Sequence, residues 1–234
     1  MTLDPIEIWN HMSGLNKAIA VLLLAMGVAT VGVVIERLLA FARANRESRQ
    51  FIEEAAPLLD AWRMDELVAL AERYPNSGLA RLVGAMMRRY QRGLSRPEGG
   101  LSPIEMARSE VERTKEGLGA ELRRGFTVLS SVASVAPFVG LLGTVVGIIM
   151  AFNAIGAGGD AGMSAVMTGI AEALFETALG LMIAIPAVLF FNYLTGRVNQ
   201  IELTLARSSG ELLDEMESRH ETPIAEVPRA RQAA

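Results

Sequence analysis

The chain has 234 residues, a formal net charge of −4 and a mean hydropathy of +0.31, and 51% of its residues are hydrophobic. It contains no cysteine and two distant histidines, His11 and His220, so disulfides, thiolate metal sites and a histidine ligand cluster are excluded. The apolar residues concentrate in charge-free runs, which is typical of an integral membrane protein and not of an ordinary soluble domain.

Three runs without any charged residue are long enough to cross a bilayer. They are Ala18–Ile35 with 18 residues, Gly125–Gly159 with 35 and Thr177–Gly196 with 20. A helix of about 20 apolar residues crosses the ~30 Å of hydrocarbon. The sequence therefore predicts an all-α protein with three transmembrane helices, two of them very long and extending into the cytoplasm. The acidic N-terminus lacks the basic region of a signal peptide.

Between the first and second runs, the sequence predicts short soluble helices. Two amphipathic helices are expected on either side of the break at 75–78, where Pro-Asn-Ser-Gly interrupts the pattern. The "SPIE" stretch at 102–105 is a capping box with Ser102 as the N-cap. No strong helix breaker follows before the glycines at 156–159, so we expect one continuous helix of roughly 50 residues from there, about 75 Å long.

Lysine and arginine placement predicts the orientation. One lies before the first run, 15 lie in residues 41–125, none in 156–176 and 5 after residue 196. Basic loops stay in the cytoplasm, which predicts a periplasmic N-terminus and a cytoplasmic C-terminus. The expected divisions are a periplasmic amphipathic segment (1–14), transmembrane helix 1 (15–40), a cytoplasmic helical domain (41–125), transmembrane helix 2 (126–155), a periplasmic loop (156–168), transmembrane helix 3 (169–196), and a cytoplasmic helical extension with a disordered tail (197–234).

Small residues recur along one face of each of the last two spans. These two stripes are Ser130, Ala133, Pro137, Gly140, Thr144, Gly147, Ala151 and Ala154, and Ala173, Thr177, Gly180, Ala184 and Ala187. One interpretation is that small residues let membrane helices approach closely. The other is that the two faces line a narrow passage or a groove for a foreign helix, where each threonine hydroxyl binds water or a carboxyl group.

Two acids stand at the start of the third span. Glu172 and Glu176 lie one turn apart on the same helix face. Glu172 suits a helix N-terminus, where the dipole favours negative charge. Glu176 lies deeper, and acids inside membranes usually face a wet interior and mark an ion path. The candidate proton-pathway residues are therefore Thr144, Thr177, Glu172 and Glu176.

The sequence carries no sign of an enzyme. It has no G-x-x-x-x-G-K-[ST] loop, no nucleophile–base pair and no metal cluster, so we expect no catalytic residue, no metal, no cofactor and no nucleic-acid partner. An ion gradient, most simply of protons, is the energy source that fits. Three helices cannot enclose a watery path and also shield it from lipid, which predicts a homo-oligomer. Threonine does not titrate, so a proton relay needs a carboxyl from another chain unless Glu176 supplies it.

The stretches "APFVGLLGTVVGIIMAF" and "GIAEALFETALGLMIAIPAVLFFN", within about residues 125–195, closely resemble the MotA/TolQ/ExbB proton-channel family. Within it, three expected spans point to the TolQ/ExbB branch, because MotA-type stators have four. The resemblance implies a pentameric ring in the bacterial inner membrane around a dimer of a single-span ExbD/TolR-like protein. A partner aspartate would take up protons, and a TonB- or TolA-like protein could receive the force.

The motif matches assign roles to individual residues. Thr144 matches the threonine of "GLxGTVxGI", Thr177 that of "ALxxTAxGL", and Glu172 the acid of "GIAEAL". Pro137 and Pro186 match the prolines of "APFVG" and "AIPAV". The residues expected to serve helix packing or structure are Pro137, Gly140, Gly143, Gly147, Gly180, Ala184, Pro186 and Asn192.

One position departs from this branch. The residue before the second motif threonine is commonly alanine, and here it is Glu176. The primary hypothesis is a proton-channel subunit that couples the proton-motive force to TonB-dependent import or a Tol-Pal type process. A gliding or surface-motility motor subunit of the same family and a passive membrane scaffold remain alternatives. Arg88, Arg89 and Arg92 form a basic cluster, either a solvated face or a contact with anionic lipid.

Overall fold

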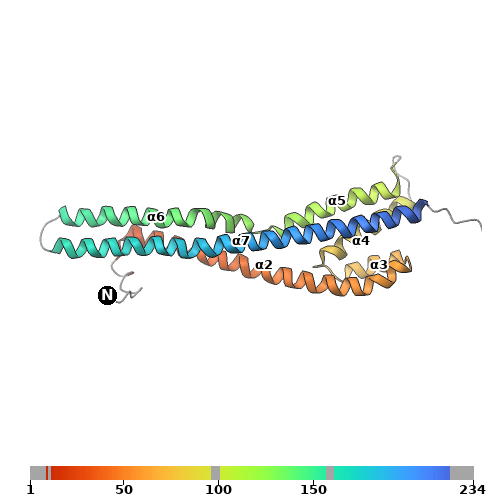
Figure 1. Ribbon diagram of the computed structural model, residues 1–234, viewed down its shortest axis with the longest axis horizontal. Helices are drawn as coiled ribbons and strands as arrows, with labels where there is room; N and C mark the ends of the chain where they lie inside the picture. The colour runs from red at the N-terminus through yellow and green to blue at the C-terminus, as the bar shows by residue number, and fades with distance from the viewer. Residues whose placement is uncertain (1–8, 10–11, 96–100, 157–160, 222–234) are drawn as a thin grey trace, which may run out of the picture. The chain divides into compact units, whose positions relative to one another are not determined.

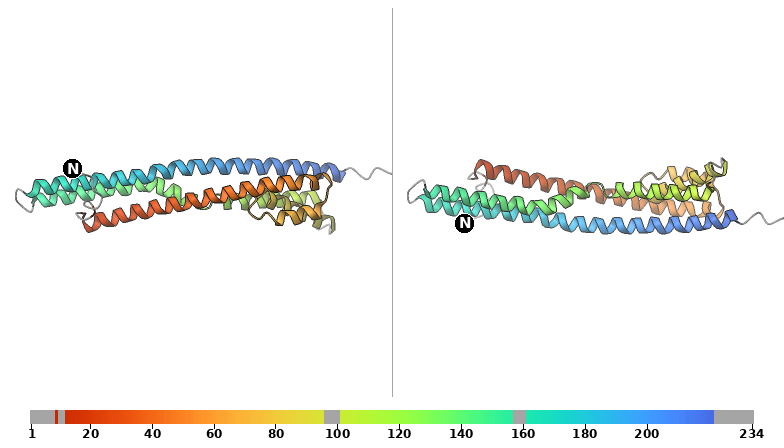
Figure 2. Two further views of the ribbon diagram at one scale, coloured as in Figure 1. Left: turned by 90° about the horizontal axis from the view of Figure 1, so that it is seen from below. Right: turned by 90° about the horizontal axis from the view of Figure 1, so that it is seen from above.

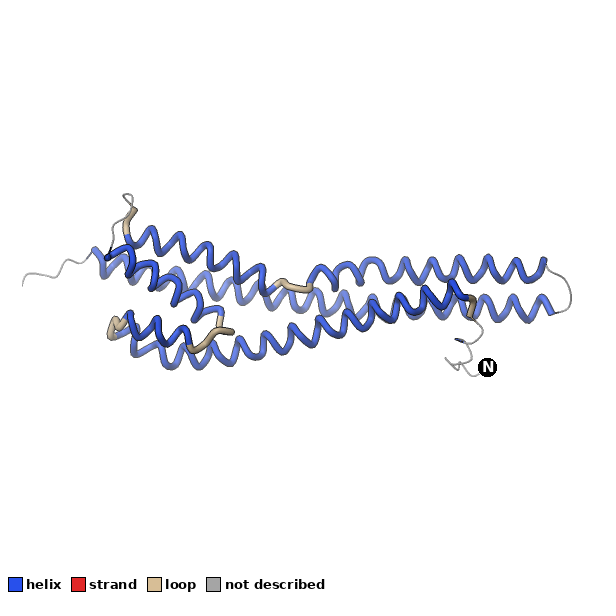
Figure 3. Tube along the Cα trace, turned by 180° about the vertical axis from the view of Figure 1, so that it is seen from behind, coloured by secondary structure: helices blue, strands red, loops and turns tan. Residues whose placement is uncertain are grey.

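The structure of the protein is a computed structural model that describes residues 9, 12–95, 101–156 and 161–221. Within these residues every regular element is a helix and there is no strand, which confirms the all-α prediction (Figures 1 and 3). The helices are α2 (Gly14–Asp60), α3 (Met64–Glu72), α4 (Gly78–Ser95), α5 (Pro103–Leu122), α6 (Phe126–Gly156) and α7 (Ala161–Glu221).

Three helices are long and apolar enough to cross a membrane, as predicted. The candidate spans lie within Gly14–Asp60, Phe126–Asn153 and Val166–His220. Two of these helices are very long, since α2 has 47 residues and α7 has 61. The hydrophobic runs of the sequence therefore form α6 and the early parts of α2 and α7.

The chain divides into two compact units. The first comprises Met1–Leu38 and Arg124–Gly196, and the second comprises Leu39–Arg123 and Arg197–Ala234, so α2 and α7 each contribute to both. In the first unit α6 and the early part of α7 run side by side in opposite directions (Figures 1 and 2). A small apolar core joins them to α2 through Ile19, Leu23, Val132, Ala136, Ala184 and Ala187.

The second unit is a helical bundle with its own core. Helix α4 packs against both α3 and α5, and the late parts of α2 and α7 complete the cluster. Its fully buried large side chains include Phe51, Leu67, Leu82, Met86, Met87, Val111 and Met216. The prediction of two helices on either side of the break at 75–78 is confirmed by α3 and α4.

The expected single helix from Ser102 into the second span is wrong. Helix α5 ends at Leu122 and α6 begins at Phe126. Gly125 lies between them with a φ of +82°, a conformation that glycine adopts without strain. A Cβ at Gly125 would lie 2.9 Å from Val33 Cγ1, so the missing side chain also allows a close approach to α2.

Other boundaries differ less. Helix α7 begins at Ala161, whereas we expected a start at 169, and α6 continues to Gly156. Most of the expected amphipathic segment (1–14) and the expected disordered tail lie outside the described residues.

The capping box predicted at the start of α5 is confirmed. The Glu105 amide donates to Ser102 Oγ at 3.1 Å, and the Ser102 amide donates to Glu105 Oε2 at 2.8 Å. We expect Ser102→Ala to weaken the first turn by about 1 kcal/mol, because the Glu105 amide loses the hydroxyl to which it donates. Hydrogen–deuterium exchange of the first-turn amides should accelerate about fivefold. The exposed Ser109→Ala in the same helix is the control, and equal exchange in both variants would contradict the prediction.

Candidate functional site

Helices α6 and α7 meet through their glycines and alanines. A Cβ on Gly140 would lie 3.3 Å from Gly180 Cα, and one on Gly147 would lie 2.8 Å from Ala173 Cβ. The Gly140 Cβ would also lie 2.9 Å from the Glu176 carbonyl oxygen, so a larger side chain at either position would require a backbone shift. The two stripes of small residues therefore face each other within one chain at Gly140, Gly147, Ala173 and Gly180, along the helices that lie side by side in Figures 1 and 2.

The two motif threonines use their hydroxyls differently. Thr177 Oγ1 on α7 donates to the Gly140 carbonyl on α6 at 3.0 Å, which links the two helices. Thr144 Oγ1 donates to the Leu141 carbonyl of its own helix at 2.6 Å. Both threonines are half-buried, so each is partly covered by its own chain and partly available to another one.

The two acids are both buried. Glu172 is 7% exposed and Glu176 is 0% exposed, although each belongs to a helix that could span a membrane. The Glu176 carboxylate lies against Gly143 of α6, where any Cβ would overlap Oε2. Neither Glu176 oxygen has a hydrogen-bond partner among the described residues. The acid that departs from the family pattern is thus the more deeply buried of the two.

The remaining predicted residues separate into two groups. Gly140, Gly143, Gly147 and Gly180 are buried where α6 meets α7, and Ala184 belongs to the core shared with α2. Pro137 lies half-buried inside α6, whereas Pro186 and Asn192 are exposed on α7.

Gly169 is a contact residue that the sequence analysis missed. A Cβ there would lie 3.0 Å from Ala151 Cβ, so Gly169 extends the close contact of α7 with α6 by a further turn. Its spacing of four residues from Ala173 was the available signal.

Large apolar side chains cover the outward surface of the spans. Phe138 on α6 is 70% exposed and Met182 on α7 is 68% exposed. Only 33% of the apolar 18-residue stretch of α6 and 22% of that of α7 is buried within the chain. A surface of this composition requires lipid or other protein chains as its surroundings.

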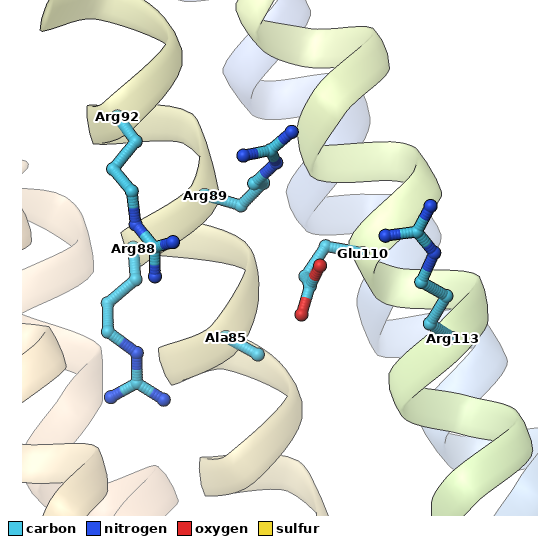
Figure 4. A pocket seen from close by; sticks show the side chains of 6 residues that line it. All are labelled: Ala85, Arg88, Arg89, Arg92, Glu110 and Arg113. Atoms are coloured by element: carbon cyan, nitrogen blue, oxygen red, sulfur yellow. The ribbon is translucent and has the colours of Figure 1, made fainter.

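The second unit holds a separate pocket of about 400 Å³ between α4 and α5 (Figure 4). It is lined by Ala85, Arg88, Arg89, Arg92, Glu110 and Arg113. Arg88 also makes an exposed ion pair with Glu72 at 3.0 Å. The basic cluster predicted from the sequence thus gains an arginine and an acid from α5, and shares no residue with the site in the spans.

In the described part of the chain, no three His, Cys, Asp or Glu side chains gather where they could hold a metal ion. The site is built instead from hydroxyls, buried carboxyls and close backbone contacts. Such groups can hold protons or water within a membrane.

Comparison with known proteins identifies the family of this chain. Residues 81–207 match the MotA/TolQ/ExbB proton channel family. The Tol-Pal system protein TolQ of Haemophilus influenzae is 30% identical over 222 residues, which cover 91% of this chain and 92% of that protein. The Biopolymer transport protein ExbB of Aquifex aeolicus is 40% identical over 108 residues, 46% of this chain and 73% of that protein.

A third relative also matches over most of the chain. The Biopolymer transport protein ExbB of Salmonella typhimurium is 28% identical over 207 residues, which cover 88% of this chain and 83% of that protein. The chain belongs to the MotA/TolQ/ExbB proton channel family. Within that family it belongs to the TolQ/ExbB branch, as its motifs indicated.

Proposed function

We propose that the chain is a subunit of an inner-membrane motor that couples the proton-motive force to force transfer to the cell envelope. The observation that carries this proposal is the contact between α6 and α7. There a half-buried hydroxyl, Thr177, and a buried acid, Glu176, lie against a glycine face in a member of a proton channel family. Thr144, Thr177, Glu172 and Glu176 line the proton path.

The working unit is a homo-oligomer, most simply a pentamer. One chain offers three spans and leaves most of their apolar surface open, which is too little to enclose a watery path away from lipid. The half-buried positions of Thr144 and Thr177 suit residues that a foreign helix completes. That helix is the single span of an ExbD/TolR-like dimer held in the central lumen.

The orientation follows from charge. The second unit carries most of the lysines and arginines and lies in the cytoplasm. The N-terminus and the turn between α6 and α7 face the periplasm. A proton that crosses ~100 mV releases about 2.3 kcal/mol, which is the energy that each passage supplies to the motor.

Gene deletion in the source bacterium tests the proposal and separates its branches. We expect loss of growth on an iron–siderophore complex if the chain serves TonB-dependent import, and detergent sensitivity if it serves a Tol-Pal type process. Either defect should be reproduced in the undeleted strain by a protonophore and reversed by the gene on a plasmid. The ExbD/TolR-like partner should co-purify with the complementing protein.

Two outcomes would favour the alternatives. Loss of surface spreading alone, with normal import and a normal envelope, would support a motility motor of the same family. Normal behaviour in all three assays, together with an oligomer that forms without any response to a protonophore, would support a passive scaffold.

A further inference from the structure

Glu176 is the buried acidic side chain whose surroundings are most unusual. It is 0% exposed, and neither of its carboxylate oxygens has a hydrogen-bond partner among the described residues. Its carboxylate fills the space that a side chain at position 143 of α6 would need, and that position is a glycine. Gly143 therefore leaves room for the acid, and the carboxyl group lies at the contact between the two helices, inside one chain.

Within the described residues, no lysine or arginine pairs with this acid. Helix α6 contains no charged residue, and α2 has none in Ala18–Ile35. On α7 the nearest charged neighbour is Glu172, one turn earlier and also buried, and no lysine or arginine lies between Ala161 and Gly196. Lys17 and Asn16 precede that run at the start of α2, and among the described residues neither of them forms a hydrogen bond or an ion pair with Glu176.

An ionised carboxylate in this environment is strongly disfavoured. Burial of an unpaired charge costs several kcal/mol, and a nearby acid increases that cost. Addition of a proton removes the charge and leaves a neutral side chain that fits beside glycine. The space beside Gly143 therefore suits the acid in its neutral form.

We propose that Glu176 is a proton-binding site within the subunit itself, between α6 and α7, distinct from the carboxyl group of a partner chain. The inference rests on the proposed function and deepens it. A proton from water adds to one carboxylate oxygen when the helices separate, and it is retained when they close. The Thr177 hydrogen bond to the Gly140 carbonyl holds the closed contact one residue away. Each subunit then carries one exchangeable proton of its own.

Carbodiimide labelling tests this directly, because a carbodiimide reacts with a protonated carboxyl group in an apolar environment. The full-length chain is placed in lipid vesicles without its partner, treated with dicyclohexylcarbodiimide, and mapped by mass spectrometry. We expect modification at Glu176 that decreases as the pH is raised and does not change with added sodium chloride. The Glu172→Gln variant should retain the label, and Glu176→Gln should lose it.

A glycine pair provides the matched control. Gly143→Ala places a Cβ where the carboxylate lies, so the Glu176 carboxyl group must leave its place against α6 and labelling should be several times faster. Gly32→Ala on α2, whose Cβ would have nothing within 4 Å, should label like the unaltered chain. The modified site is mapped on the unaltered chain, so the result does not depend on how well Glu176→Gln folds.

Two results would overturn the inference. Modification of Glu172 with none at Glu176 would mean that Glu176 is not protonated at the helix contact. Protection of Glu176 by sodium ions at constant pH would mean that the site holds a metal cation instead of a proton. Neither result depends on force output, so failure of the motor hypothesis, seen in the deletion experiment, is a separate outcome.

Discussion

Gly180→Leu is expected to disrupt the first unit and to abolish any activity that depends on it. A Cβ at Gly180 would lie 2.7 Å from the Ala136 carbonyl oxygen and 3.2 Å from Gly140 Cα. These are backbone atoms of α6, which cannot move aside as a flexible side chain could. Overpacking of a core costs about 1–3 kcal/mol, and a leucine against backbone belongs at or above the upper end of that range.

The thermal midpoint of the solubilised protein, followed by fluorescence-detected size-exclusion chromatography, measures this effect. The control is Gly196→Leu on the same helix, since a Cβ there would have nothing within 4 Å. We expect the control to lie within about 0.5 kcal/mol of the unaltered chain. An unchanged midpoint in Gly180→Leu would show that α6 and α7 are not in contact at this position.

The spanning helices could be predicted because hydrophobicity determines them almost alone. Each charge-free run is long enough to cross the bilayer, and α2, α6 and α7 follow these runs. The capping box was equally predictable, because Ser102 and Glu105 interact over three residues of sequence. The break at Gly125 was not, because Gly117 and Gly119 are helical with the same local composition.

What distinguishes Gly125 is a tertiary contact. Its left-handed conformation coincides with a close approach to Val33 of α2, a residue far away in sequence. The same limit applies to the acids. Their spacing placed Glu172 and Glu176 on one face, but only the packing of α7 on Gly143 reveals which acid is the more deeply buried.

The small residues had two interpretations, close packing of membrane helices and a polar passage. The contact between the stripes bears on both. Glycines at 140, 147 and 180 bring α6 and α7 together within one chain, whereas Thr144 and Thr177 remain half-buried at the edge of that contact. Close packing and a polar path are therefore compatible in one site. The glycines set the distance between the helices, and in the proposed function the hydroxyls and acids are the groups that act on a proton.

Thr177→Val is the substitution that best separates a proton path from a scaffold. Valine keeps the shape of threonine and removes the hydroxyl that donates to the Gly140 carbonyl at 3.0 Å. For a scaffold the loss is one hydrogen bond, about 0.5–1.5 kcal/mol of stability, and the oligomer should work as before. For a proton path we expect force output to fall by roughly tenfold or more, equivalent to about 1.4 kcal/mol. The oligomer itself should still assemble.

Three further variants make the comparison specific. Thr177→Ser keeps the hydroxyl and should retain most of the output, and Thr144→Ala should lose it as Thr177→Val does. Thr195→Val is the matched control on α7, because Thr195 Oγ1 donates only to the Phe191 carbonyl of its own helix at 2.7 Å. Growth or envelope integrity that depends on the proton-motive force gives the readout, with oligomer size measured in parallel. If Thr177→Ser and Thr177→Val give the same force output in that assay, the hydroxyl has no role beyond packing, and the path must run elsewhere.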